Sequence, residues 1–336
     1  MATLGISPAR PVASRRFLFL LVIGLVGVAF AATFTGRATS WLQAFLLIFG
    51  SLVVTAVPFV AIGAVAASVV SVFVPESFIE RIDRLPRVIQ LPAAGLAGMA
   101  LPICECGSVP LARRLMLRGI SPSNAVTFML AAPIVNPVVI ASTFVAYRGR
   151  GSLVVMVGGR FVLGLLVAMV VGWVVGRRPV TDVLRIETDT APEPVVLGRP
   201  EPRWRRLFVH IAGDFSFMAR YLVLGAAIAA LVQTFLPQQI IGGLASVPIV
   251  DTLAMMGLAV VLSLCSESDA FIGASFGQMG FGPSTQLAFL VFGPMFDLKL
   301  GAIYAGTFRR RVFIAIVVTS AVAALVFTTW IRLVSG

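Results

Sequence analysis

Long apolar stretches separated by short basic segments set the hydrophobic pattern of this chain. Residues 17–34 and residues 41–75 contain no charged side chain. About 20 apolar residues are enough for an α-helix to cross the hydrocarbon core of a bilayer. Stretches of this length recur along the chain, so the pattern predicts an all-α polytopic membrane protein with about seven transmembrane helices and two broken or re-entrant segments.

The expected elements follow from where these stretches begin and end. Transmembrane helices are predicted at residues 17–34, 42–73, 123–146, 152–176, 207–236, 285–306 and 312–334. Glycines and polar residues interrupt the segments 91–117 and 252–282, and the pattern leaves open whether these are hairpins or full crossings.

The same pattern divides the chain into four parts. Residues 1–40 form an N-terminal extension with the first transmembrane helix, residues 41–176 a first membrane repeat, residues 177–206 a polar cytoplasmic linker, and residues 207–336 a second membrane repeat. The N-terminus shares features with a cleavable signal peptide. Its apolar run is longer than usual for one, which favours an uncleaved first helix.

The two halves of the chain match in sequence. Residues 63–79 align with residues 225–241 at an offset of 162 (225 − 63), and seven of the 17 positions are identical. Residues 101–136 align with residues 262–297 at an offset of 161 (262 − 101), and seven of the 36 positions are identical. Glycine, proline and cysteine match in register, whereas chance similarity between apolar segments would match leucine, valine and alanine. The pattern therefore predicts an internal duplication.

The distribution of basic residues predicts that the two halves face opposite sides of the membrane. Six arginines lie between residues 81 and 118 of the first repeat, whereas residues 221–298 of the second contain no lysine or arginine. Cytoplasmic loops carry an excess of basic residues. Equivalent parts on opposite sides make an inverted-topology repeat, an architecture found in alternating-access transporters.

Composition narrows the class of protein further. The chain is 59% hydrophobic and 12% charged, with a net charge of +12. The arginines lie mostly in loops and at helix ends, so this charge indicates membrane topology and not nucleic-acid binding. No Walker A lysine motif occurs, so the sequence does not predict direct use of ATP. No soluble segment is large enough for an enzyme domain, and no cofactor is expected.

Charged residues in otherwise apolar segments are the first candidates for function. A charge at the centre of a bilayer costs about 2.5–3.5 kcal/mol on insertion scales, so it usually faces a cavity or a partner. Asp297 and Lys299 pair directly only if the helix is unwound there, which Pro294 makes plausible. The same break is expected in the first repeat. The charged candidates are Glu105, Glu267, Asp269, Asp297 and Lys299, and the candidates at the first break are Pro133, Asn136 and Pro137.

Three cysteines and one arginine complete the set of candidates. Cys104, Cys106 and Cys265 are either small packing residues or soft sulfur ligands for a thiophilic metal or metalloid. A structural zinc site is not expected from Cys-x-Cys spacing with one histidine in the chain. Arg160 is predicted either to bind an anion or a carboxylate such as Asp297, or to cap the carbonyls of a broken helix.

The motifs at residues 104–144 (CECGSVPLARRLMLRGISPSNAVTFMLAAPIVNPVVIASTF), 264–277 (LCSESDAFIGASFG) and 293–300 (GPMFDLKL) resemble those of the ArsP/YraQ-like predicted permease family. The likeness covers roughly residues 41–310, and it also highlights Gly107 and Pro110. It implies a permease of the cytoplasmic membrane. The best-known branch of the family exports trivalent organoarsenicals such as methylarsenite.

Three functions remain open at this point. The first is a secondary transporter that exports a small solute by alternating access. Its physiological role would be arsenic resistance. The second is a permease for another metal, an anion or a sulfur metabolite. The third is a membrane thiol-redox protein that uses Cys104 and Cys106. The expected partners are a small-molecule or ion substrate and the lipid bilayer, and the sequence sets neither transport direction, coupling ion nor oligomeric state.

Overall fold

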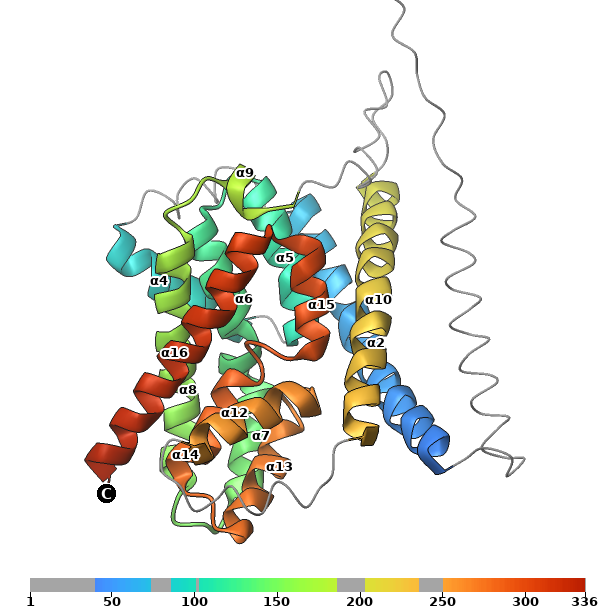
Figure 1. Cartoon of the computed structure of the whole chain (residues 1–336). Coiled ribbons are helices and arrows are strands. Elements are labelled where there is room, and N and C mark those ends of the chain that lie inside the picture. The colour runs from blue at the N-terminus through green and yellow to red at the C-terminus, as the bar shows by residue number, and fades with distance from the viewer. Residues whose placement is uncertain (1–39, 74–85, 101–102, 186–202, 236–249, 336) are drawn as a thin grey trace, which may run out of the picture.

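Helices make up almost all of the regular structure in the computed structural model, which describes residues 40–73, 86–100, 103–185, 203–235 and 250–335 (Figure 1). Within these ranges the β-structure is an isolated bridge between Leu184 and Phe308. The all-α class predicted from the apolar pattern is confirmed. The predicted first helix at residues 17–34 lies outside the described residues.

Two long helices stand at one side of the molecule. These are α2 (Ser40–Phe73) and α10 (Arg203–Phe235), which pack along each other. They begin and end close to the limits predicted from the sequence, because long apolar runs fix them. We refer to them below as the helix pair.

The other helices form a second group, called here the hairpin unit. Its members are α4 (Arg87–Leu96), η1 (Ala97–Ala100), α5 (Glu105–Leu117), α6 (Pro122–Val135), α7 (Pro137–Tyr147), α8 (Leu153–Val175), α9 (Val180–Val183), α12 (Val250–Leu262), α13 (Asp269–Phe276), η2 (Gly277–Met279), α14 (Pro283–Phe292), α15 (Leu298–Thr307) and α16 (Arg310–Ser335).

Two of the predicted crossings are broken near their centres. The segment predicted at 123–146 is α6 followed by α7, with a break at Asn136, and Pro137 begins the new helix. The segment predicted at 285–306 is α14 followed by α15, with residues 293–297 between them. A proline suits the first turn of a helix because its missing N–H has no partner there in any case.

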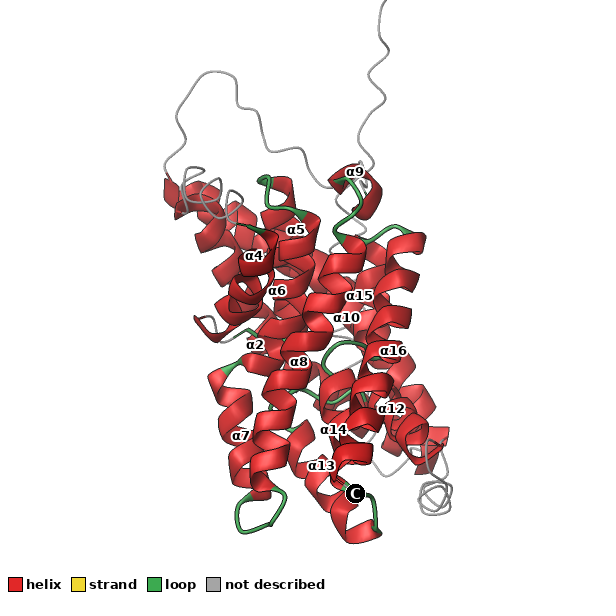
Figure 2. Ribbon diagram, turned by 90° about the vertical axis from the view of Figure 1, so that its left-hand side faces the viewer, coloured by secondary structure: helices red, strands yellow, loops and turns green. Residues whose placement is uncertain are grey.

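The two interrupted segments lie at opposite ends of the unit. In both views α4 and α5 lie in the half that carries α9, whereas α12 and α13 lie in the other half (Figure 1, Figure 2). Each segment ends its first helix and begins its second near the middle of the molecule. The starts of α7 and α15, at the two helix breaks, lie at a similar level.

The order of elements repeats along the chain. The series α2, α4, α5, α6, α7, α8 is followed by α10, α12, α13, α14, α15, α16. The backbone repeats in detail too, because Gly119 and Gly280 both adopt a positive φ, of 98° and 91°. These glycines are 161 residues apart (280 − 119), which is the offset of the sequence match. A positive φ is strained for residues with a Cβ atom, so glycine is the suitable residue at both turns.

Apolar surface and helix length fit a bilayer. Among the described residues, four helical stretches are long and apolar enough to cross a membrane, at Trp41–Val65, Pro122–Tyr147, Leu153–Val175 and Arg310–Leu333. Many large apolar side chains on these helices are exposed, as expected where the surrounding solvent is lipid. The chain is therefore an integral membrane protein.

Candidate substrate-binding site

A buried cluster of charges lies where the start of α5 meets the second helix break. Lys299 Nζ lies 3.5 Å from Glu105 Oε1 and 3.4 Å from Asp297 Oδ2. All three side chains are at most 2% exposed. The two carboxylates come from different halves of the chain, so the cluster joins the halves through one ammonium group. We call these three residues the lysine cluster.

Helix starts hold the carboxylates in place. Asp297 is the N-cap of α15 and accepts a hydrogen bond from the Leu300 backbone N–H at 2.7 Å. Glu105 is the first residue of α5, and Ser266 Oγ donates to its Oε2 at 3.0 Å. The N-terminus of a helix carries a partial positive charge, which favours a carboxylate at each of these positions.

The lysine cluster lacks hydrogen bonds at its paired atoms and carries more negative than positive charge. Within the described residues, Lys299 Nζ, Glu105 Oε1 and Asp297 Oδ2 are buried without a hydrogen-bond partner, despite the ion pairs. With both carboxylates ionised, the cluster carries one surplus negative charge (−1 − 1 + 1). Glu267 adds another carboxylate with a buried, unpartnered Oε2. Buried charge of this kind is costly unless a proton, an ion or a ligand balances it.

Arg160 and Asp269 form a second charged site, in which both carboxylate oxygens of Asp269 are hydrogen-bonded. The Arg160 guanidinium donates to both carboxylate oxygens of Asp269, at 2.8 and 2.7 Å. It also donates to Thr143 Oγ1 and to the Ser266 carbonyl oxygen. Arg160 therefore binds a carboxylate and a backbone carbonyl, as predicted, but the carboxylate is that of Asp269 and not that of Asp297, which pairs with Lys299. The contact joins α8 to the start of α13.

The three cysteines lie around the lysine cluster. Cys104 is the N-cap of α5, and its side chain shares a hydrogen bond with that of Cys106. Cys265 lies near enough to Lys299 and Cys104 to interact with both electrostatically. All three are free thiols. Across the described part of the chain, no three His, Cys, Asp or Glu side chains are arranged to hold a metal ion.

The remaining predicted residues shape the backbone around the site. Asn136 is buried and caps α7 by accepting a hydrogen bond from the Val138 backbone N–H at 2.9 Å. Gly107 is the point of contact with α2, since a Cβ on Gly63 would lie 2.5 Å from Gly107 Cα. The prolines lie inside or beside the broken helices, namely Pro110 in α5, Pro133 in α6, Pro137 at the start of α7 and Pro294 in the second break.

Sequence reasoning missed Ser266 and Thr143. Ser266 links the two charged sites, because its hydroxyl binds Glu105 and its carbonyl oxygen accepts from Arg160. It also stands at the position equivalent to Glu105 (266 − 105 = 161), so the two repeats meet at matching residues. The repeat alignment could have pointed to Ser266, whereas no sequence signal marks Thr143.

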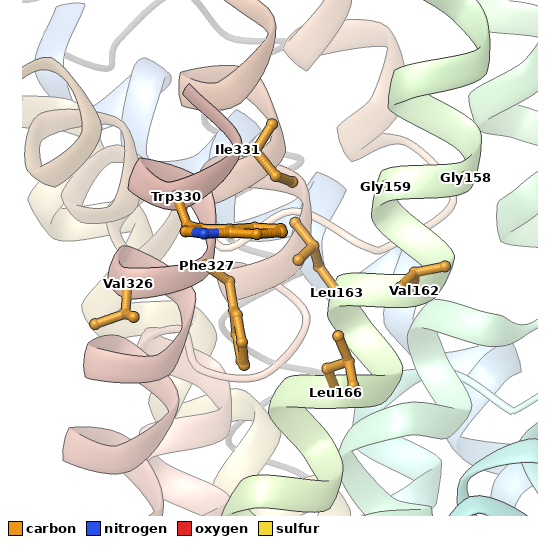
Figure 3. A pocket seen from close by; sticks show the side chains of 9 residues that line it. All are labelled: Gly158, Gly159, Val162, Leu163, Leu166, Val326, Phe327, Trp330 and Ile331. Carbon is orange, nitrogen blue, oxygen red and sulfur yellow. The ribbon is translucent and has the colours of Figure 1, made fainter. Parts of the chain in front are cut away.

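An apolar pocket on the outside of the bundle does not belong to this site. It has a volume of about 560 Å³ and lies between α8 and α16, lined by residues such as Leu163, Phe327 and Trp330 (Figure 3). None of the charged or cysteine candidates lines it. Its lining suits hydrocarbon and offers no group to recognise a polar solute.

Apolar spanning helices, two helix breaks and a buried charge cluster at the second break define a class of protein. Non-helical backbone within a membrane is tolerated where it is buried in protein or lines a cavity, and transporters bind substrates at such places. The fold and the site together are those of a membrane permease.

Comparison with known proteins identifies the family. The sequence profile of the family described as "Predicted permease" matches residues 41–332, and the chain belongs to this family. The "UPF0718 protein YcgR" of Bacillus subtilis (strain 168) is 36% identical over 272 residues, which cover 81% of this chain and 91% of that protein.

A second relative is named "Putative two-component membrane permease complex subunit" and comes from Streptococcus mutans serotype c. It is 29% identical over 299 residues, covering 88% of this chain and 97% of that protein. No solved structure matches the chain significantly.

Proposed function

We propose that this chain is a secondary transporter that binds a small solute at the lysine cluster and moves it by alternating access. The observation that carries the proposal is the buried cluster of Glu105, Asp297 and Lys299, whose paired charges lie 3.4 and 3.5 Å apart and make no hydrogen bond with each other. A permanently closed structural ion pair would be expected to satisfy these atoms, because an unmade buried hydrogen bond costs about 1–3 kcal/mol. A site that binds and releases a ligand must instead leave polar atoms free to bond to that ligand.

The repeated order of elements supports an inverted-topology repeat. The arginines at the C-terminal end of α5 and those that follow α8 lie at the end of the molecule that carries α9. The positive-inside rule puts this end in the cytoplasm and the end that carries α13 outside. On this assignment the protein resides in the cell membrane, with α4–α5 entering from the cytoplasm and α12–α13 from outside.

Proton exchange is the proposed source of energy. Asp269 is fixed by two hydrogen bonds from Arg160, so it is poorly placed to lose and regain its charge during transport. The surplus negative charge lies instead on Glu105, Asp297 and Glu267. A proton on one of these groups would balance the cluster in one conformation and be released in the other.

Trivalent organoarsenicals are the first proposed substrates, and efflux is the proposed direction. The support is chemical, because three free thiols surround the cluster and soft sulfur binds soft metalloids. In the alternative proposal, a permease for another metal, an anion or a sulfur metabolite, the same charged site binds the solute. The thiols are then not required as ligands. The thiol-redox alternative has less support, since it gives no role to the charged cluster or to the second repeat.

A protein partner is also proposed. The relative from Streptococcus mutans is named as a subunit of a two-component complex, and the match covers nearly all of it. We therefore expect a second component to accompany this chain in the membrane.

The test is substitution of cluster residues in cells that depend on the protein. Growth against a panel of thiophilic toxicants first identifies the substrate class. Lys299→Met is expected to abolish resistance when cells with equal amounts of wild-type and variant protein in the membrane are compared. Arg332→Met is the matched control, because it also removes a cation from a buried carboxylate, Asp251, but outside the cluster. Resistance that survives Lys299→Met would exclude the proposed site.

A Cys104→Ser/Cys106→Ser/Cys265→Ser variant separates the substrate classes. Loss of organoarsenical resistance is expected if the thiols are ligands. Full resistance in this variant would show that the solute is recognised by the charged cluster alone.

A further inference from the structure

The helix pair covers one end of the hairpin unit and leaves the equivalent end uncovered. In the pair, α2 packs against α5 and α10 packs against α15. The repeat equivalents of α5 and α15 are α13 and α7. Neither is among the helices against which the pair packs extensively. The two repeats are therefore arranged asymmetrically, because the helix pair packs extensively against α5 and α15 but not against the equivalent helices α13 and α7.

The asymmetry is visible residue by residue. Lys299 on α15 is 1% exposed, whereas its equivalent on α7, Val138 (299 − 161), is 51% exposed. Pro110 on α5 is buried, whereas its equivalent on α13, Phe271 (110 + 161), is 51% exposed. On α7 the residues 138, 141 and 145 are exposed at helical spacing, and the exposed residues 137 and 144 adjoin them. The uncovered positions thus form one face of a helix, matching the face that α10 covers on α15.

The contacts of the pair with the covered face are made by glycines. A Cβ on Gly225 of α10 would lie 2.7 Å from Lys299 Cα and 3.3 Å from Ala302 Cβ. A Cβ on Gly63 of α2 would lie 2.5 Å from Gly107 Cα. Gly63 and Gly225 are themselves equivalent, at the offset of 162. Small residues let helices approach closely without interlocking side chains, which leaves such an interface free to separate.

Hydrogen bonds between the two repeats hold the hairpin unit together at the end that carries α13. Arg160 of α8 binds Asp269 of α13, and Tyr147 of α7 donates a hydrogen bond to Gln286 of α14 at 2.9 Å. Arg150, which follows α7, donates to the Ala274 carbonyl oxygen in α13. A movement that keeps these bonds moves the pair against the whole unit.

We propose that the helix pair alternates between two docking faces, the observed one on α5 and α15 and its repeat equivalent on α7 and α13. This proposal rests on the proposed transport function and names the moving part. In the observed arrangement the pair closes the end that carries α9. In the alternative arrangement it closes the opposite end and uncovers α5, α15 and the lysine cluster between them.

Repeat equivalence gives the contacts of the alternative arrangement. The contact of Gly225 with Ala302 becomes a contact of Gly63 (225 − 162) with Ala141 (302 − 161). The contact of Gly63 with Gly107 becomes one of Gly225 with Ser268 (107 + 161). Ala141 and Ser268 are exposed in the present structure, so both are free of other helices.

Cysteine cross-linking in native membranes tests these contacts. Gly225→Cys/Ala302→Cys reports the observed arrangement, and Gly63→Cys/Ala141→Cys reports the alternative one. Both pairs are expected to form disulfides on mild oxidation, and each disulfide is expected to stop transport until a reductant is added. Gly63→Cys/Ser142→Cys is the matched control, because Ser142 points about 100° away on α7. Single Gly63→Cys and Gly225→Cys variants control for disulfides with the native thiols.

A second measurement avoids substitution at the glycines. Spin labels at Val57 of α2 and Phe144 of α7, which are both exposed, measure the distance between the pair and the uncovered face. Two distance populations are expected, and the shorter one is expected to change with pH or substrate.

The outcomes separate this proposal from the function on which it rests. A Gly63→Cys/Ala141→Cys pair that stays uncross-linked, with one distance population between the labels, would overturn the alternation. Cross-linking of the Ser142 control as readily as the Ala141 pair would also overturn it. If the cross-link is absent but Lys299→Met abolishes transport, the proposed transport site is supported and the proposed movement is wrong. If the cross-links form but Lys299→Met transports normally, the movement is supported and the proposed site is wrong.

Discussion

Replacing Lys299 by methionine removes the cation that lies between two buried carboxylates. At separations of 3.5 and 3.4 Å, each ion pair has a Coulomb energy of about 5 kcal/mol for an effective dielectric constant of about 20. Desolvation of the three groups offsets much of this energy in the wild type. In the variant the carboxylates remain buried and repel each other, so the net loss of stability is expected near the 3–5 kcal/mol typical of a broken buried pair.

The charge count predicts a specific rescue. The cluster carries −1 in the wild type, −2 in Lys299→Met, and −1 again in Lys299→Met/Asp297→Asn. Thermal unfolding of the purified protein in detergent should therefore show a lower midpoint for the single variant and a substantial recovery for the double variant. Transport should remain absent in both variants, because the ammonium group of the proposed binding site is gone.

A different ranking would refute this reasoning. If Lys299→Met is as stable as the wild type, the two carboxylates do not depend on the ammonium group. If the double variant is less stable than Lys299→Met, the loss comes from packing and not from uncompensated charge. Lys299→Arg serves as the control that keeps the charge and changes its shape.

Three further predictions concern neighbouring residues. Arg160→Met should destabilise the fold by about 3–5 kcal/mol, because Asp269 is left buried and unpaired, and Arg160→Met/Asp269→Leu should recover much of the loss in thermal unfolding. No recovery would mean that Arg160 acts through its other contacts. Glu105→Gln should reduce the pH dependence of transport in vesicles if Glu105 carries the exchanged proton, and an unchanged pH profile would move that role to Asp297 or Glu267. Asn136→Ala should lower stability by about 1 kcal/mol through loss of the α7 cap, and unchanged thermal unfolding would contradict that role.

The positions of the long helices could be predicted because the bilayer fixes their length. The segments expected at 42–73 and 152–176 are α2 (Ser40–Phe73) and α8 (Leu153–Val175). The helix breaks were also predictable, since proline and a polar residue interrupt an apolar run at each of them. Segment 17–34 lies outside the described residues, and the inverted topology stays a proposal.

The pairing of the charged residues could not be predicted to the same extent. Lys299 and Asp297 are neighbours in sequence, so an unwound helix was enough to join them. Arg160 pairs with Asp269 because the rotation of α8 about its axis and the position of the start of α13 bring the two side chains together. The local sequence pattern predicts neither the rotation nor the position. The same holds for Glu105, whose contact with Lys299 depends on the packing of α5 against α15.

Methylarsenite accumulation in everted membrane vesicles tests the central claim most directly. Vesicles containing equal amounts of wild-type or Lys299→Met protein are compared with and without a proton gradient, with vesicles lacking the protein as background. Gradient-dependent accumulation is expected in wild-type vesicles, and background levels are expected in Lys299→Met vesicles. Equal accumulation in the two sets, or background levels in both, would show that the lysine cluster does not transport methylarsenite.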